Sequence, residues 1–170
     1  MSMKKLVLVL LLLSSLNSLF ARSFGYFVAQ DGEKTSSNAY GGASFGLVLQ
    51  PFQRSFLNPS LFVSLSMGTD MQSRFLLPAA TMGVTIDLFR TMNHPFMFIA
   101  HNKIAYDPSV SVGMQLRFDD STRPALYFGA SPFKFSQPDF WYEFCSPFGT
   151  YSNKGWSWGV AIFRFTFLCL

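Results

Sequence analysis

Bulky apolar residues alternate with small or polar residues along much of this chain. In Ala43–Gln50 the bulky set is Phe45, Leu47 and Leu49, and the residues between them are small or polar. The same alternation recurs at Leu61–Gly68, Met82–Leu88 and Val110–Phe118. Successive side chains of a β-strand point to opposite faces, so each segment predicts a strand with one apolar face and one small-polar face.

Eight strands follow from this pattern: Ser23–Gln30, Tyr40–Gln50, Leu61–Gly68, Arg74–Arg90, Phe96–Lys103, Val110–Phe118, Ala125–Phe135 and Trp156–Phe167. The polar segment Asp31–Asn38 and the long segment Ser136–Lys154 are expected to be connections. Asp139–Phe148 is an alternative strand, because its aromatic residues also alternate; it gives nine strands, or ten if Arg74–Arg90 contains two. An even number brings both chain ends to one side, so eight strands are the first expectation and ten the second.

The first residues have the pattern of a secretory signal peptide. Lys4 and Lys5 precede the unbroken aliphatic run Leu6–Leu13, and Ala21 supplies a small residue for cleavage. The apolar run is short for a membrane anchor, since spanning a bilayer takes about 20 residues. We therefore expect residues 1–21 to be removed and residues 22–170 to form a single domain.

Composition favours a membrane barrel over a soluble sheet. Charged residues make up 13% of the chain and aromatic residues 18%, whereas roughly 25% of residues are charged in ordinary soluble domains. No apolar run after the leader is long enough for a spanning helix. An exported chain of this kind is typical of a closed antiparallel up-and-down transmembrane β-barrel, whose apolar face meets lipid. The expected location is the bacterial outer membrane, and outer-membrane lipid is an expected partner.

The small-polar faces are expected to line the barrel interior. These residues are Gly42, Ser44, Gly46, Ser64, Ser66, Gly68, Gly83, Thr85, Ser111, Gly113 and Gln115. Larger side chains from neighbouring strands would fill the space above them, because a barrel of eight strands is just wide enough for side chains or one small ligand. Asp87 and Arg117 also fall on the inward set. A buried charge needs a partner, so we expect a structural ion pair between them.

In the last expected strand, no single alternation places all the large apolar residues on one face. If Phe163, Phe165 and Phe167 face lipid, Arg164 lies inside the barrel. Trp156 and Trp158 would then also point inward, unless a bulge near Ile162 reverses the alternation. We expect the phenylalanines to face outward.

Motifs for chemistry are sparse. His94 and His101 lie in no nucleophile or zinc signature, and there is no phosphate-binding, dinucleotide-binding or calcium-binding motif. We therefore expect no enzymatic activity, no cofactor and no metal. Cys145 and Cys169 fit a disulfide or two free thiols, and the sequence leaves both open. Without Lys4 and Lys5 of the leader, the formal net charge falls from +4 to +2, a balance that argues against a nucleic-acid partner.

One aromatic segment stands out as a candidate interaction site. Phe140, Trp141, Tyr142 and Phe144 lie within the expected Ser136–Lys154 connection. Exposed aromatic side chains often mark binding surfaces, whereas the alternatives are an aromatic band at the membrane interface or an extra strand. A role in binding host or surface molecules would depend on such loops.

The terminal segment from Phe163 to Leu170, with the overall plan, resembles small outer-membrane β-barrels of the OmpA-like and OmpW-like eight-stranded type. The resemblance implies that barrel-assembly machinery reads the last strand. It favours an integral barrel with a structural, adhesive or surface-interaction role through exposed loops. A small conduit or binding site for hydrophobic molecules is the OmpW-like alternative, and a soluble lipocalin-like exported barrel is a third.

Overall fold

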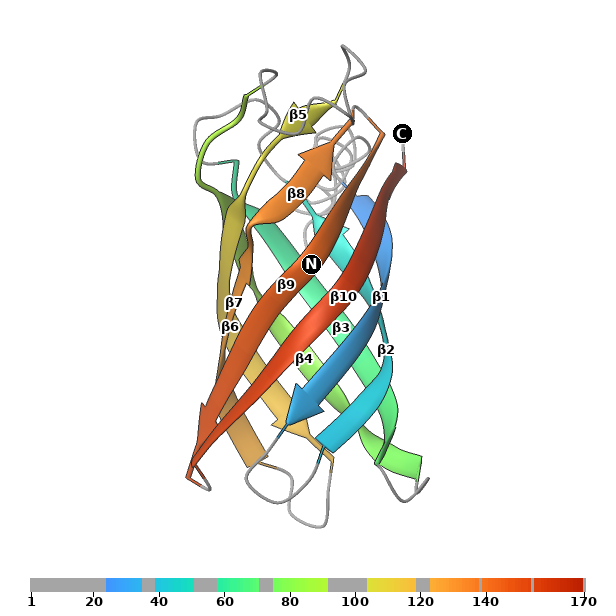
Figure 1. The fold of residues 1–170 in the computed structure, drawn as a ribbon, viewed down its shortest axis with the longest axis vertical. Coiled ribbons are helices and arrows are strands. Elements are labelled where there is room, and N and C mark those ends of the chain that lie inside the picture. The colour runs from blue at the N-terminus through green and yellow to red at the C-terminus, as the bar shows by residue number, and fades with distance from the viewer. Residues whose placement is uncertain are drawn as a thin grey trace, which may run out of the picture.

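The strands of the chain form one closed antiparallel barrel (Figure 1). The computed structural model describes residues 24–34, 39–50, 58–70, 75–91, 104–118, 123–137, 139–153 and 155–169. The wall strands are β1 (Phe24–Lys34), β2 (Ala39–Leu49), β3 (Ser60–Asp70), β4 (Phe75–Asp87), β6 (Ser109–Arg117), β7 (Arg123–Ser131), β9 (Phe140–Ser152) and β10 (Gly155–Cys169). Each pairs with the next, and β10 pairs with both β9 and β1, which closes the ring. The predicted closed, eight-stranded, up-and-down barrel is confirmed.

Two short strands extend the wall at one end. β8 (Phe133–Ser136) continues β7 along the edge of β9, and β5 (Ala105–Tyr106) pairs with β8. Of the ten strands in the sheet, these two lie outside the ring, which leaves eight in the wall. β4 is one strand, so the alternative of ten wall strands is wrong among the described residues.

Two of the expected connections are strands. Ser136–Lys154 was expected to be a connection, but it contains β9, and so the alternative strand at Asp139–Phe148 is the correct interpretation. The expected strand Phe96–Lys103 lies outside the described residues, as does the expected signal peptide. The expected loop Asp31–Asn38 is also wrong in its first part, because β1 continues to Lys34. Its charges are compatible with a strand because Asp31 and Glu33 point into the barrel, where hydroxyl groups donate to them.

The alternation separates an outer from an inner face as predicted. On β3, Leu61, Val63, Leu65 and Met67 are 44–53% exposed, whereas Ser64 between them is 7% exposed. Val112 on β6 is exposed and Gln115 is buried. The outer face is therefore apolar and accessible, which is the reverse of a water-soluble sheet.

The strands β8, β9 and β10 change phase at one level. Phe133, Phe144 and Phe163 pair in one row and all face outward. One step along the wall, Cys145 has a positive φ of 46°, and Ile162 is the extra residue in the register between β10 and β1. A bulge of this kind reverses which residues face inward. Consequently Trp156, Trp158 and the three phenylalanines of β10 all face outward, and Arg164 faces inward.

The two ends of the barrel differ in their connections. At one end, which we call the tip end, residues 35–38, 71–74, 118–122 and 153–154 join consecutive wall strands, in connections of four, four, five and two residues. The other end, the terminal end, carries both ends of the barrel domain, because Phe24 pairs with Cys169. β2 and β4 also end there, and β3 and β6 begin there, so the connections of ten and twenty-one residues between these strands start and finish at this end; the second connection contains β5. β5 and β8 lie at this terminal end (Figure 1).

Candidate functional site

A row of charged side chains crosses the interior of the barrel toward the terminal end. Lys134 of β8 pairs in register with Glu143 of β9, which pairs in register with Arg164 of β10. The Arg164 Nη1 atom lies 3.3 Å from Glu143 Oε2, and the Glu143 side chain is only 3% exposed. Ser131 and Ser146 also donate to Oε2, over 2.5 and 3.4 Å. Glu143 is thus a buried carboxylate that hydroxyl groups and cations surround, which is what a buried charge requires.

The structure does not bring Asp87 and Arg117 together. Both face the interior as expected, but Asp87 Oδ1 accepts from Lys134 Nζ over 2.5 Å, and Asp87 Oδ2 accepts from Asn58 over 3.0 Å. The Lys134 side chain is 4% exposed, and its ammonium group also lies 4.9 Å from the centre of the Trp141 ring. The predicted pair is therefore wrong, because Asp87 ends its strand at the terminal end and Arg117 ends its strand at the tip end.

Arg117 spans the barrel to a different partner. It donates through Nη2 to Glu33 Oε1 of β1, and β1 and β6 lie four places apart in the ring of eight strands. Ser157 Oγ donates to the same Glu33 oxygen over 2.5 Å. This ion pair therefore crosses the lumen near the tip end, while the Lys134–Asp87 pair lies near the terminal end.

Aromatic rings fill the lumen between these two ion pairs. Phe27, Phe62 and Tyr127 belong to the buried core, and Phe148 packs against it. The Phe27 ring lies over Gly46 and the Phe62 ring over Gly83, so closely that a Cβ atom at either glycine would overlap the ring. The expectation that larger neighbours fill the space above small residues is confirmed at these positions.

A small polar cavity lies among the described lumen residues. A cavity of about 30 Å³ lies among Phe27, Asp31, Ser44, Gln115 and Arg164. A water molecule needs at least about 10–15 Å³ measured in this way. The cavity therefore has room for about two waters and not for an organic ligand. The buried Arg164 Nε has no hydrogen-bond partner among the described residues, which makes it a natural donor to such a water.

A cap of polar contacts and aromatic rings covers the terminal end. Ser136 donates to Asp107 Oδ2, and the exposed Arg90 lies 3.7 Å from Asp107 Oδ1. Tyr106 of β5 packs against the Phe135 ring of β8 and donates to the carbonyl of Pro132 over 2.8 Å. Burial raises the pKa of the Asp107 carboxyl above its ordinary value, and the Ser136 hydroxyl group and the Arg90 and Lys134 cations partly offset this.

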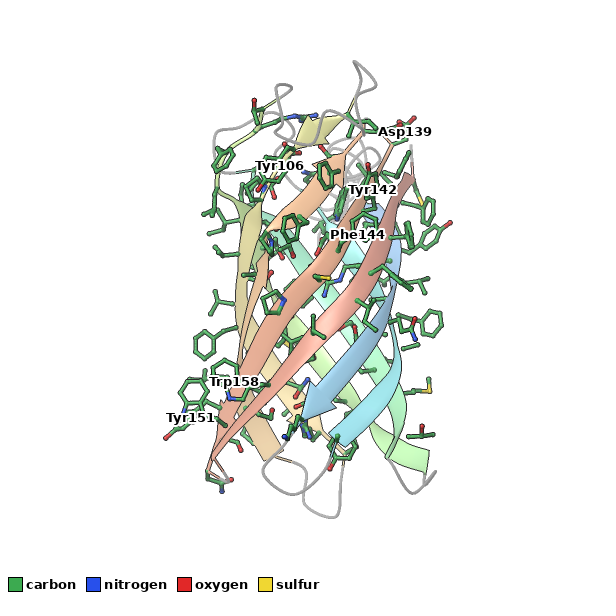
Figure 2. All side chains as sticks on the ribbon, in the orientation of Figure 1. Tyr106, Asp139, Tyr142, Phe144, Tyr151 and Trp158 are labelled. Atoms are coloured by element: carbon green, nitrogen blue, oxygen red, sulfur yellow. The ribbon has the colours of Figure 1, made fainter. Side chains whose placement is uncertain are left out.

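The outer surface carries aromatic side chains at both ends of its apolar band. Tyr151, Trp156 and Trp158 are 46–65% exposed and pack on one another near the tip end. Figure 2 shows Tyr151 and Trp158 at that end, and Tyr142 and Phe144 toward the terminal end. Aromatic girdles at two levels are typical of membrane-spanning barrels.

The aromatic candidates from the sequence lie on strand β9. Trp141 is buried inside the barrel, and Phe144 is 37% exposed on the outer face. Phe140 and Tyr142 are half-buried, and their rings stack on each other. An exposed binding loop is therefore the wrong interpretation of these four residues, because the wall pairs them with β8 and β10.

The described residues provide no cluster of metal-binding side chains. Among them no group of three or more His, Cys, Asp or Glu side chains could hold a metal ion. Cys145 and Cys169 are both free and exposed, and His94 and His101 lie outside the described residues. No helix in the described part of the chain is long and apolar enough to cross a membrane.

Sequence reasoning missed three of the charged lumen residues. Glu33 belongs to a segment that was expected to be a loop. Lys134 belongs to the expected strand Ala125–Phe135, whose two faces are both apolar, so the alternation does not indicate which face is inward. Glu143 belongs to an expected connection, yet Trp141 and Glu143 alternate with Tyr142 and Phe144, which was a usable signal of the inward face. The pairing partners could not be read from the sequence, because they depend on which strands meet across the ring.

Comparison with known proteins supplies a fold-level likeness. No protein-family model and no curated protein matches the chain. Among solved structures, the chain is similar to the N-terminal β-barrel domain of Pseudomonas aeruginosa OprF, at 18% sequence identity and a TM-score of 0.49. That similarity covers 84% of this chain and 97% of the OprF domain. The eight-stranded closed barrel follows from the strand pairing within this chain and does not depend on that similarity.

Proposed function

We propose that this protein is an integral outer-membrane β-barrel with a sealed lumen and a structural or interaction role, and that it is neither an enzyme nor a conduit. The observation that carries the proposal is the contrast between the two faces of the wall. Leu61, Val63, Leu65 and Met67 are about half exposed on the outside, while charged groups are paired inside. Contiguous apolar surface of this kind is stable in lipid and unfavourable in water.

The height of the apolar band supports this location. On β10, Trp156 lies at the tip-end aromatic level, and Phe167, which stacks on Tyr26 and Phe140, lies at the terminal-end level. Eleven residue steps separate Trp156 from Phe167. At ~3.3 Å per step and a tilt of ~40°, they lie ~28 Å apart along the barrel axis. Transmembrane barrels have an apolar band of about 25 Å. The band therefore matches the hydrocarbon layer of a membrane.

The filled lumen argues against the two ligand-binding alternatives. A conduit needs a continuous passage, whereas Phe27, Phe62 and Tyr127 pack across the described interior. A lipocalin-like carrier needs room for its ligand, whereas the cavity of about 30 Å³ beside Arg164 is large enough only for water. The charges inside are paired with one another and are not arranged around an open site.

The connection lengths indicate which end meets which compartment. We place the terminal end in the periplasm, because export delivers the chain there and only the tip-end connections then have to cross the membrane. Those connections have two to five residues. Such short segments are easily moved across the membrane, and they offer little surface for adhesion. The cap of β5 and β8 would then face the periplasm, reversing the usual pattern of short periplasmic turns and long outer loops.

Two measurements test the proposal. Alkaline carbonate extraction of membranes from cells making the full chain should leave the protein in the pellet, and release into the supernatant would contradict membrane insertion. Single cysteines introduced at Asn153, in the exposed turn between β9 and β10, and at Asp139 test orientation with a membrane-impermeant thiol reagent on intact cells, in a Cys145→Ala and Cys169→Ala background. Labelling near the tip end alone is expected; labelling at Asp139 alone would reverse the assignment.

A further inference from the structure

A groove runs along the outer wall over β10, β1, β2 and β3. Its volume is about 660 Å³, and its lining includes Gln30, Gly41, Ala43, Met67 and Phe163. Phe163 and Phe165 form a ridge on one side and Met67 stands on the other, while Gly41 and Ala43 leave the floor low. The groove opens on the face that we assign to lipid, and so it is unrelated to the filled lumen.

A polar side chain lies in this groove at membrane depth. Gln30 is exposed on the outer face of β1, between Phe163 of β10 and Ala43 of β2 in register. Phe163 is seven residues from Trp156 and four from Phe167 on β10. These steps place it ~18 Å and ~10 Å from the two aromatic levels, at the rise and tilt used above. Gln30 therefore lies well inside the apolar band.

The chemistry of the Gln30 amide requires a polar partner. It carries two N–H donors and a carbonyl acceptor. Among the described residues no side-chain hydrogen bond of Gln30 occurs. Acyl chains offer neither donors nor acceptors, so a lipid in the groove would leave every one of these positions unsatisfied. Membrane proteins satisfy such groups by hydrogen bonds across an interface, at places where small residues let backbones approach closely.

We propose that the groove is the interface of a homodimer in which Gln30 of one copy hydrogen-bonds Gln30 of the other. This rests on the proposed membrane insertion. Two copies inserted in the same direction are related by a two-fold axis along the membrane normal, so equal residues lie at equal depth. An amide is self-complementary, because its N–H donates to the partner's carbonyl while its carbonyl accepts in return. The low floor at Gly41 and Ala43 gives the facing copy room to approach.

Crosslinking in vesicles tests the geometry. The background is the full mature barrel with Cys145→Ala and Cys169→Ala, which removes both exposed thiols. Gln30→Cys is then compared with Val112→Cys, which is equally outward on β6, across the ring from β1. With a short bis-maleimide at low protein density, we expect several-fold more dimer from Gln30→Cys. Equal yields from the two variants would overturn the proposal.

Association measurements in the same vesicles test the chemistry. Fluorescence energy transfer between labelled copies should show a dimer, and Gln30→Leu should weaken its association constant about three- to tenfold, as expected for two hydrogen bonds in a membrane. Ala43→Trp should fill the groove and abolish association, whereas Val112→Trp should leave it unchanged. A monomeric wild type, or variants that all associate alike, would refute the interface. Carbonate extraction of each variant separates this failure from a failure of membrane insertion.

Discussion

The buried carboxylate of Glu143 gives the sharpest test of the sealed lumen. Replacing it by glutamine keeps the side-chain shape and removes the charge that faces Arg164 at 3.3 Å. Arg164 is then a largely buried cation with one partner fewer. Breaking a buried pair in this way costs about 3–5 kcal/mol. Because Asp31 lines the same cavity as Arg164, we expect the lower end, about 3 kcal/mol, or a change of roughly 150-fold in the folding equilibrium.

Urea unfolding of the barrel in lipid vesicles measures this loss. Tryptophan fluorescence and gel migration of unheated samples follow the same transition. The matched control is Glu33→Gln, because the Glu33–Arg117 pair lies near the tip end with side chains 14% and 26% exposed. We expect that control to cost about 1 kcal/mol or less, as partly exposed pairs do.

A double variant separates charge from packing. Adding Arg164→Met to Glu143→Gln removes both charges, so it should recover most of the stability that the single change loses. If Glu143→Gln costs no more than Glu33→Gln, or if the double variant recovers nothing, the interior around Glu143 is not a closed, low-dielectric site.

Three further outcomes follow from the same structure. Gly83→Ala should lower the free energy of unfolding by about 1–3 kcal/mol, because its Cβ would lie 2.5 Å from the Val112 carbonyl oxygen and 2.9 Å from the Phe62 ring. Gly32→Ala, where the nearest atom would be 3.7 Å away, should be close to neutral, and equal costs would contradict the packing described. The raised pKa of Asp107 means that its protonated form is favoured in the folded cap, so its contribution is complete below the ordinary value of 3.8 and is lost as pH rises through the raised value. Asparagine is a neutral stand-in for the protonated carboxyl, so wild type should lose stability relative to Asp107→Asn as pH rises through that range. A difference that stays constant, or that moves in favour of wild type, would count against a buried carboxyl. Planar bilayers containing the protein should show no ion conductance, and reproducible channel steps would disprove the sealed lumen.

The wall of the barrel could be predicted from the sequence more completely than the contacts inside it. Strict alternation assigned both faces of β2, β3 and β6, because each of these strands has one side in the lumen and one outside. It failed for β9, where the phase reverses at Cys145 and Pro147 interrupts the pattern. Eight strands were expected, but one member of that set, Phe96–Lys103, lies outside the described residues and β9 takes a place in the wall.

The interior pairings depend on geometry that alternation does not encode. Asp87 and Arg117 were correctly assigned to the inward face, but they belong to opposite ends of the barrel. Arg117 meets Glu33 only because β1 and β6 face each other across the closed ring. The bulge at Ile162 lets Arg164 face inward while Trp156 and Trp158 face outward. From the sequence, such a bulge was one possibility, and nothing in the alternation required it.

Lipid quenching of single tryptophans tests the central claim, a membrane-spanning barrel with an apolar outer face, most directly. Three variants each retain one of Trp141, Trp156 and Trp158, which are 7%, 53% and 65% exposed, and are folded into vesicles of brominated lipid. We predict strong quenching of Trp156 and Trp158 and little quenching of Trp141, because bromine atoms reach only the outer wall. Equal quenching of all three, or none at all, would contradict the account.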